Sequence, residues 1–214
     1  YKENLNKVPY REDDMLGGHD PYSASKAACE IAIDCYRKSF LDQDKIPIAS
    51  ARAGNVIGGG DWSEDRLIPD AIKAWSSEKP LIIRNPDAIR PWQHVLEPLY
   101  GYMVLAQEIS LDSTKSGSYN FGPSSSSNAS VKEVISLANQ FYEGGETKFK
   151  SSKENPRESD WLMLDINKSK KELNISPKWN LVDTVEQTIN WYKDFIDGTD
   201  PYQISYSQIE LYDK

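Results

Sequence analysis

The sequence predicts an α/β fold in which a parallel sheet of few strands is flanked by several helices. Two observations support this fold class. Short strand-like runs at 46–51 and 118–121, each followed closely by glycine, alternate with longer stretches whose apolar residues recur at helical spacing. The chain also has 214 residues, 38% of them hydrophobic, which is enough for a buried core.

The first half of the chain contains the clearest element boundaries. Asp20 is a favourable N-cap and Pro21 suits the first helical position, so a helix is predicted over 22–41. A buried strand is predicted over 46–51, and it leads into a glycine-rich loop over 52–62, where open α/β sheets place ligand loops. The remaining predicted elements of this half are a short helix over 67–75, a strand over 80–84 and a Pro-rich irregular segment over 85–98.

The second half alternates in the same way. A helix is predicted to begin at Glu97, and a strand follows over 118–121. Ser130 and Glu133 have the spacing of a capping box, which predicts the start of another helix. A last long helix is predicted over 181–196, because its apolar residues recur at helical spacing.

Composition and charge argue against several kinds of partner. The formal net charge of -8 disfavours nucleic acid and an anionic membrane surface, although a local group of arginines can still hold an anionic small molecule. No apolar run approaches the ~20 residues of a membrane-spanning helix. With two cysteines and two histidines, the chain offers neither a disulfide framework nor a metal site, and we expect a reducing, cytoplasmic location.

Tyr22 and Lys26 are the candidate catalytic pair. Their spacing of four residues places them side by side on the first turns of the predicted helix. An ammonium group favours the ionised form of a neighbouring phenol, so Tyr22 can serve as a base while Lys26 also donates to a ribose hydroxyl. The same spacing also occurs on ordinary surface helices, and by itself it leaves that alternative open.

Three motifs follow one another along the chain: Tyr-x-x-x-Lys at 22–26, RAGNVIG at 52–58 and RPWQHV at 90–95. Together they resemble the second half of an extended short-chain dehydrogenase/reductase, specifically the nucleotide-sugar 4,6-dehydratase group. The resemblance covers about residues 10–195 in long, nearly gap-free stretches. The runs most similar to members of the group that use a CDP-sugar are 20–26, 52–62, 65–70 and 84–98.

The resemblance implies that this chain is the C-terminal portion of such an enzyme. The implied domains are part of a Rossmann-type NAD-binding domain at 1–60 and 91–123, a smaller nucleotide-sugar-binding domain at 61–90 and 124–200, and a tail at 201–214. The family's glycine-rich pyrophosphate turn and its Ser-Asp-Lys triplet are expected upstream of Tyr1, so the chain alone is expected to be inactive. The glycines at 58–60 lack the Gly-x-Gly-x-x-Gly spacing, and we interpret them as a turn that passes close to substrate.

The resemblance also implies a reaction and its residues. NAD would be the cofactor, and CDP-D-glucose would lose water to become CDP-4-keto-6-deoxy-D-glucose. Tyr22 would remove the 4-hydroxyl proton, Lys26 would hold the nicotinamide ribose, and relatives pair into homo-oligomers through helices that include this one. Further implied cofactor contacts are Arg52 and Asn55. The implied substrate contacts, chiefly to the diphosphate, are Asn55, Arg66, Arg84, Arg90 and Arg157, since a guanidinium can give two parallel hydrogen bonds to phosphate oxygens.

Other interpretations of these residues stay open. Asn55 also suits a turn. Arg66 and Arg84 also suit surface ion pairs, and Trp92 is expected to pack in the core rather than stack on a base. Relatives favour His where Arg157 stands. For the protein as a whole, the alternatives are an epimerase or a dTDP- or GDP-sugar dehydratase of the same family, or an inactive fragment or scaffold without catalysis.

Overall fold

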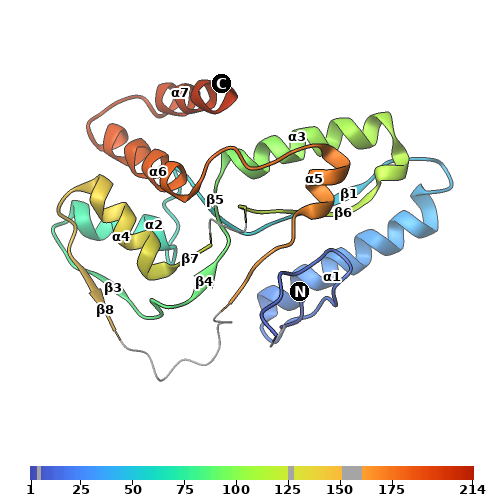
Figure 1. Cartoon of the computed structure of the whole chain (residues 1–214), viewed down its shortest axis with the longest axis horizontal. Helices are drawn as coiled ribbons and strands as arrows, with labels where there is room; N and C mark the ends of the chain where they lie inside the picture. The colour runs from blue at the N-terminus through green and yellow to red at the C-terminus, as the bar shows by residue number, and fades with distance from the viewer. Residues whose placement is uncertain (4–5, 125–127, 151–160) are drawn as a thin grey trace. The chain divides into compact units, whose positions relative to one another are not determined.

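The computed structural model describes residues 1–3, 6–124, 128–150 and 161–214. The chain has the α/β fold that the sequence predicts (Figure 1). Its contacts divide it into two compact units. Unit 1 comprises 1–54, 98–122 and 162–176, and unit 2 comprises 55–97, 123–161 and 177–214. These units differ from the sequence-based division at 55–60 and 91–97, which lie in unit 2, and at 162–176, which lie in unit 1. The division into an NAD-binding and a nucleotide-sugar-binding domain stays a prediction.

Unit 1 is built on a parallel strand pair. β1 (Ala49–Ala53) pairs with β6 (Gly117–Phe121) in a register that runs from Ala49 opposite Gly117 to Ala53 opposite Phe121. The helical elements are α1 (Pro21–Tyr36), a π-helical continuation (Arg37–Leu41), α3 (Leu96–Leu111), a 3-10 turn (Ser113–Lys115) and α5 (Asn167–Leu173), with the first two residues of α3 belonging to unit 2. The small apolar core of unit 1 consists of Leu105, Tyr119, Phe121 and Leu173.

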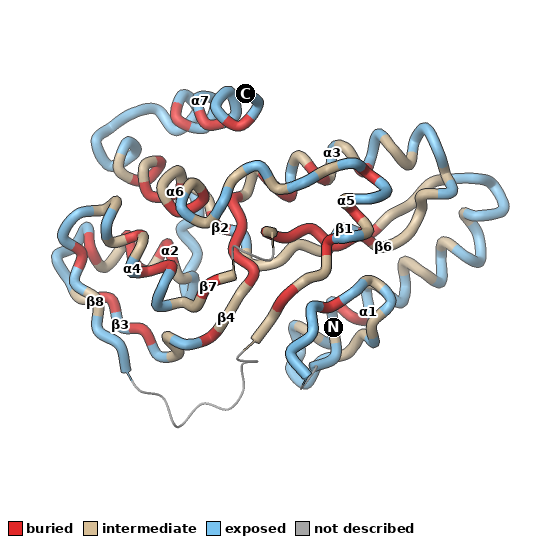
Figure 2. The backbone as a smooth tube through the Cα atoms, in the orientation of Figure 1, coloured by how far each residue is buried: buried red, intermediate tan, exposed pale blue. Residues whose placement is uncertain are grey.

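α1 begins where the sequence predicts. Asp20 caps it by accepting a hydrogen bond from the Ser23 N–H at 3.0 Å, and a proline occupies the first turn. Within α1, all of which the structure describes, Ala27 alone is buried (Figure 2). Tyr36 and, beyond α1, Phe40 are large apolar residues of the predicted helix 22–41, yet both side chains are exposed. Apolar burial therefore contributes little to holding this helix.

Unit 2 is built from short strand pairs and longer helices. The strand pairs are β2 (Asn55–Ile57) parallel to β5 (Trp92–His94), β3 (Leu81–Ile83) parallel to β8 (Thr147–Phe149), and β4 (Ile89–Arg90) antiparallel to β7 (Ala129–Ser130). The helices are α2 (Leu67–Ser76), α4 (Val131–Tyr142), α6 (Leu181–Ile196) and α7 (Pro201–Asp213). The predicted capping box at the start of α4 is confirmed by its two reciprocal hydrogen bonds.

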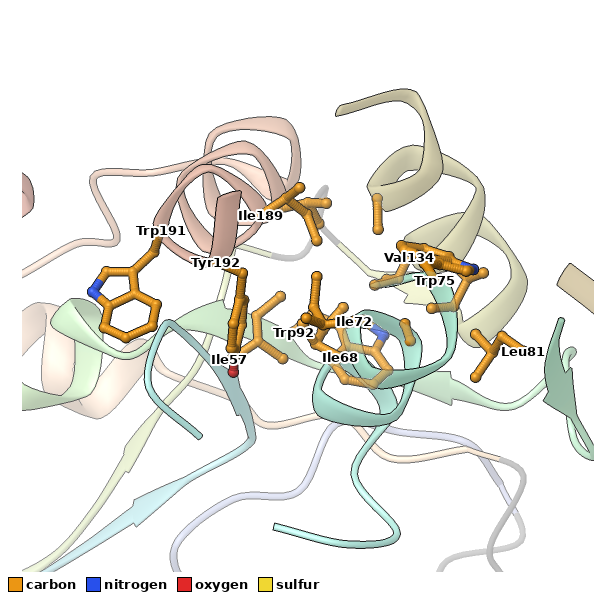
Figure 3. Packing of buried hydrophobic residues seen from close by; sticks show 14 of the residues in the cluster. Ile57, Ile68, Ile72, Trp75, Leu81, Trp92, Val134, Ile189, Trp191 and Tyr192 are labelled. Carbon is orange, nitrogen blue, oxygen red and sulfur yellow. The ribbon is translucent and has the colours of Figure 1, made fainter. Parts of the chain in front are cut away.

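The core of unit 2 lies among α2, α4, α6 and the β2–β5 pair (Figure 3). Ile68 and Ile72 come from α2, Val134 from α4 and Ile189 from α6, and each is at most 1% exposed. Full burial of an aliphatic side chain of this size contributes about 1.5–3 kcal/mol. Amphipathic helices thus supply most of the apolar contacts, and β2 and β5 are held against them.

Several parts of the chain differ from the sequence prediction. β1 runs on to Ala53 and β2 occupies Asn55–Ile57, both within the stretch 52–62 that was predicted as a loop. The segment 85–98 is not irregular throughout, because β4 and β5 lie in it on either side of Pro91, where a missing N–H interrupts no ladder. Residues 201–214, predicted as a tail, contain α7, in which Ile204 and Tyr212 are buried. The strands β7 and β8 were not predicted, because two and three residues are too few to show an alternating pattern of apolar and polar side chains.

None of the helices in the described part of the chain has the length and apolarity that a membrane crossing requires.

Candidate active site

Tyr22 and Lys26 lie side by side on α1, as their spacing predicts. The Lys26 Nζ is 5.9 Å from the centroid of the Tyr22 ring. The Tyr22 side chain is 71% exposed and Lys26 is also exposed. Among the described residues, Lys26 Nζ has no hydrogen-bond or ion-pair partner, so its ammonium donors are available. The pair therefore fits a phenol that exchanges a proton beside a cation that can hold ribose hydroxyls.

Arg52, predicted to contact the cofactor, is surrounded by protein acceptors. Its Nε and one Nη donate to the two carboxylate oxygens of Glu30, at 3.0 Å each. The same Nη donates to Ser118 Oγ at 3.0 Å, and the other Nη donates to the Tyr1 hydroxyl at 2.8 Å and the Glu12 carbonyl at 3.1 Å. These contacts use all five guanidinium N–H donors. The cofactor contact stays a prediction, and it would have to displace one of these partners.

Glu30 stands one helical turn beyond Lys26 and is largely buried. Its carboxylate also accepts a hydrogen bond from Ser50 Oγ at 2.7 Å. Burial acts to raise the pKa of Glu30, but the hydrogen bonds from Arg52 and Ser50 and the charge of Arg52 outweigh it, so the pKa lies below its ordinary value of 4.5. Glu30 is therefore ionised near neutral pH and forms a true ion pair.

On its other side, Arg52 contacts the N-terminal segment through the Tyr1 hydroxyl and the Glu12 carbonyl. The Tyr1 hydroxyl donates to Asn120 Oδ1 at 2.5 Å, and the Tyr1 ring stacks on Tyr10 with centroids 5.0 Å apart. Asn120 is fully buried, and its Nδ2 donates to the carbonyls of Tyr10 and Asp165 at 2.9 and 3.1 Å. Arg52 is thus held from two directions within unit 1.

Sequence reasoning missed Glu30, Ser50 and Ser118. Two signals were available. Glu30 follows Lys26 by four residues on the same helix, and Ser50 and Arg52 share one face of a strand because side chains alternate. The contact of Ser118 with Arg52 and Ser50 could not be found from sequence, because it depends on the pairing of Ser50 with Ser118 in the β1–β6 register.

Asn55 and Arg90 are brought near each other by strand pairing in unit 2. Asn55 lies opposite Trp92 in the β2–β5 register, and Arg90 ends β4 two residues before Trp92. Both are partly buried, and the Arg90 Nη1 donates to the carbonyl of Ile89 at 2.9 Å. Two predicted substrate contacts therefore share one region of this unit.

The other predicted arginines are less closely held. Arg66 is the N-cap residue of α2 and Arg84 follows β3, and both are exposed. Neither arginine forms an ion pair with a described residue, so the described part of the chain does not support the alternative that they are surface ion-pair residues. Arg157 lies outside the described residues.

The glycine-rich loop after β2 packs closely against other parts of unit 2. A Cβ on Gly58 would lie 2.6 Å from Val95 Cγ1, and one on Gly59 would lie 2.0 Å from the Trp191 ring. The Tyr192 hydroxyl, also from α6, donates to the Gly58 carbonyl at 3.3 Å. The close approaches that glycine permits here are to α6 and Val95, and the interpretation of a turn that passes close to substrate stays a prediction.

Trp92 and His94 have structural surroundings. Trp92 is 5% exposed and donates through Nε1 to the Ala129 carbonyl at 3.1 Å, as expected for a core residue. His94 Nδ1 accepts from the Leu96 N–H at 3.3 Å, and its ring packs against Trp179. Burial lowers the pKa of His94 to about 4, so it is neutral at pH 7 and has no role as a cation.

The predicted residues thus fall into two sets. Tyr22, Lys26 and Arg52 belong to unit 1, and Asn55, Arg66, Arg84 and Arg90 belong to unit 2. The first set contains an exposed phenol, an exposed ammonium and a guanidinium that is bound by protein acceptors. The second offers cations and an amide suited to phosphate oxygens.

A comparison with curated proteins finds a relative that is longer than this chain. CDP-glucose 4,6-dehydratase of Salmonella typhimurium is 39% identical over 209 residues, which is 95% of this chain and 58% of that enzyme. The chain therefore spans less than two thirds of the length of this relative.

Solved structures and a family model agree on the fold. A UDP-N-acetylglucosamine 4-epimerase from Methanobrevibacter ruminantium has a TM-score of 0.76 at 20% identity, covering 92% of this chain and 60% of that one. A dTDP-glucose 4,6-dehydratase from Bacillus anthracis, in complex with NAD, has a TM-score of 0.71 at 19% identity, covering 91% and 58%. These likenesses show the extended short-chain dehydrogenase/reductase fold. A family model also matches residues 4–188, and this chain therefore belongs to the family described as GDP-mannose 4,6 dehydratase.

Proposed function

We propose that this chain is the C-terminal part of an NAD-dependent enzyme that converts CDP-D-glucose into CDP-4-keto-6-deoxy-D-glucose with loss of water. The observation that carries the proposal is the exposed Tyr22–Lys26 pair on α1. It occurs in a chain that is 39% identical, over 95% of its length, to a CDP-glucose 4,6-dehydratase.

Tyr22 and Lys26 do the proton chemistry of this proposal. The phenolate oxygen of Tyr22 accepts the proton of the sugar 4-hydroxyl. The Lys26 ammonium donates to the hydroxyls of the nicotinamide ribose. NAD, when bound, supplies the hydride chemistry of the cycle. We assign the acid for water elimination to no residue of this chain.

Arg90 and Asn55 hold the substrate in this proposal. Arg90 gives a bidentate, charge-assisted contact to the diphosphate, and Asn55 donates its amide to a phosphate or sugar oxygen. The exposed cations Arg66 and Arg84 are further contacts for the diphosphate or the base. Arg157 is kept as a substrate contact on the sequence alone.

The proposal also includes a cellular location and an oligomeric state. Nucleotide sugars and NAD are small molecules of the cytoplasm, which fits the reducing location expected from the cysteine content. Homo-oligomers would form through α1, whose extension beyond the catalytic pair carries the exposed side chains of Ile31, Tyr36 and Phe40.

The decisive experiment uses the complete protein that contains this chain. With CDP-glucose and NAD we expect a product lighter by one water, a 4-keto chromophore and no net NADH. Faster turnover of dTDP-glucose or a GDP-sugar would show that the nucleotide is wrong. Interconversion of 4-epimers without loss of water would identify an epimerase, and absence of any turnover would favour a non-catalytic scaffold.

A further inference from the structure

We propose that Glu30 and Arg52 form a positioning pair that fixes the orientation of α1, and with it the places of Tyr22 and Lys26, and that Arg52 does not contact the cofactor. The expected effect on turnover rests on the proposed function. The expected effect on α1 itself does not, so the two ideas can fail separately.

Helical spacing links the pair to the candidate catalytic residues. Tyr22, Lys26 and Glu30 are four residues apart in turn, so they leave α1 on neighbouring positions of one face. The two contacts at 3.0 Å join a planar carboxylate to a planar guanidinium. Such a bidentate contact specifies direction as well as distance, so it restrains rotation of α1 about its own axis as well as its distance from β1.

α1 needs such a restraint because its apolar contacts are few. Ala27 is its one buried residue, and a methyl group buries little area. The side chains of Arg52 and Glu30 are only 14% and 18% exposed, so solvent screens their interaction weakly. In the described chain, the anchor of α1 on β1 is therefore polar and directional.

Arg52 is itself immobilised by its other partners. Ser118 Oγ, the Tyr1 hydroxyl and the Glu12 carbonyl take the donors that Glu30 leaves. Ser50 Oγ meanwhile donates to the Glu30 carboxylate at 2.7 Å. Because every N–H of the guanidinium has an acceptor, Arg52 influences the cofactor only by way of α1.

The test compares variants of the complete protein. Glu30→Ala and Arg52→Ala break the pair, and Glu30→Gln and Arg52→Lys are milder forms in case the alanine variants fold poorly. Asp34→Asn is the matched control, because Asp34 pairs with Arg37 and Lys38 beside it on the helix and not with β1. Hydrogen–deuterium exchange of the α1 amides, NAD affinity, kcat and KM are measured for each.

We expect faster exchange over 21–36 in the pair variants and not in Asp34→Asn. With misplaced catalytic groups, kcat should fall by about 10–100-fold while KM and the Kd for NAD change by less than about threefold. The double alanine variant should be no worse than either single one, because both remove the same contact.

Two results would overturn the inference. One is a Kd for NAD raised more than about tenfold, the size of a lost charged hydrogen bond, by Arg52→Ala but not by Glu30→Ala, which would make Arg52 a direct cofactor contact. The other is unchanged exchange in α1 with unchanged kcat. If the parent protein does not turn over CDP-glucose, the proposed function fails, and exchange with NAD affinity still decides whether the pair positions α1.

Discussion

Glu30 in unit 1 is a partly buried carboxylate and Glu97 in unit 2 a buried one, yet their pKa values are shifted in opposite directions. Glu30 faces the guanidinium of Arg52, and its pKa is lowered although burial acts to raise it. Glu97, at the start of α3, is 8% exposed, and burial raises its pKa above 4.5 although three hydrogen bonds act to lower it.

The partners explain the difference. Glu97 Oε1 accepts the backbone N–H groups of Lys178 and Trp179 at 3.0 and 2.7 Å, and Oε2 accepts the Tyr212 hydroxyl at 2.8 Å. The donors that bind Glu97 are neutral, and the charge of Lys178 is the smallest of the effects that lower its pKa, whereas the bidentate guanidinium of Arg52 both binds Glu30 and opposes its charge. Unit 1 thus joins α1 to β1 through a charged pair, whereas unit 2 uses a carboxylate to hold backbone N–H groups and the helix α7.

The largest expected effect tests whether α1 carries the chemistry. Tyr22→Phe removes the proton acceptor and keeps the ring, so kcat should fall by about 10²–10⁴-fold with little change in Tm. Tyr202→Phe, at a tyrosine of α7 that is 73% exposed, is the matched control and should leave kcat unchanged. A Tyr22→Phe enzyme within about threefold of the parent would mean that Tyr22 is an ordinary surface residue of α1.

The next effect tests the role of Glu97. Glu97→Ala leaves two backbone N–H groups and the Tyr212 hydroxyl without their acceptor, so the free energy of unfolding should fall by about 2–4 kcal/mol. Glu97→Gln keeps an acceptor oxygen and should lose less. Glu146→Ala serves as control because that carboxylate is 61% exposed and pairs with Lys148 at the surface. Urea unfolding measures all three, and equal losses in Glu97→Ala and Glu146→Ala would contradict a holding role.

A third test asks whether unit 2 binds phosphate as proposed. Arg90→Lys replaces a bidentate contact by a point charge, which should cost about 1.5–3 kcal/mol and appear mainly as a raised KM for CDP-glucose. Arg11→Lys, at an exposed position of unit 1, should leave KM unchanged. An unchanged KM with a collapsed kcat would instead put Arg90 beside the reacting atoms or in support of the fold.

The smallest expected effect is on the pH dependence of stability. The stability that ionised Glu30 contributes is present above its unfolded pKa of about 4.5 and is lost as pH falls through its lower folded pKa. Folded Glu97 binds its proton more tightly than the unfolded chain does, so stability falls as pH rises from about 4.5 through its higher folded pKa.

Unfolding curves of the two glutamine variants separate these windows. Glu30→Gln should flatten the stability profile only below about pH 4.5, and Glu97→Gln only above it. If both variants altered the same window, the contrast between the two carboxylates would be wrong.

Much of the local structure could be predicted because its causes lie within one or two helical turns. Asp20 caps α1 through its own third neighbour, and Ser130 and Glu133 cap α4 in the same way. The spacing of Tyr22 and Lys26 is likewise a property of one helix. The short strands β4, β5, β7 and β8 were beyond this reasoning, because a strand of two or three residues exists only through its partner.

The sequence by itself determined the α/β class, the start of α1 and the adjacency of Tyr22 and Lys26, since these follow from neighbours along the chain. The tertiary structure alone decided what surrounds Arg52, because its acceptors come from segments that meet only when β1 pairs with β6. It also decided that residues 201–213 form a packed helix, since the Tyr212 hydroxyl reaches Glu97 across a separation of 115 residues. Contacts between distant segments depend on which elements pack together, and no local pattern encodes that choice.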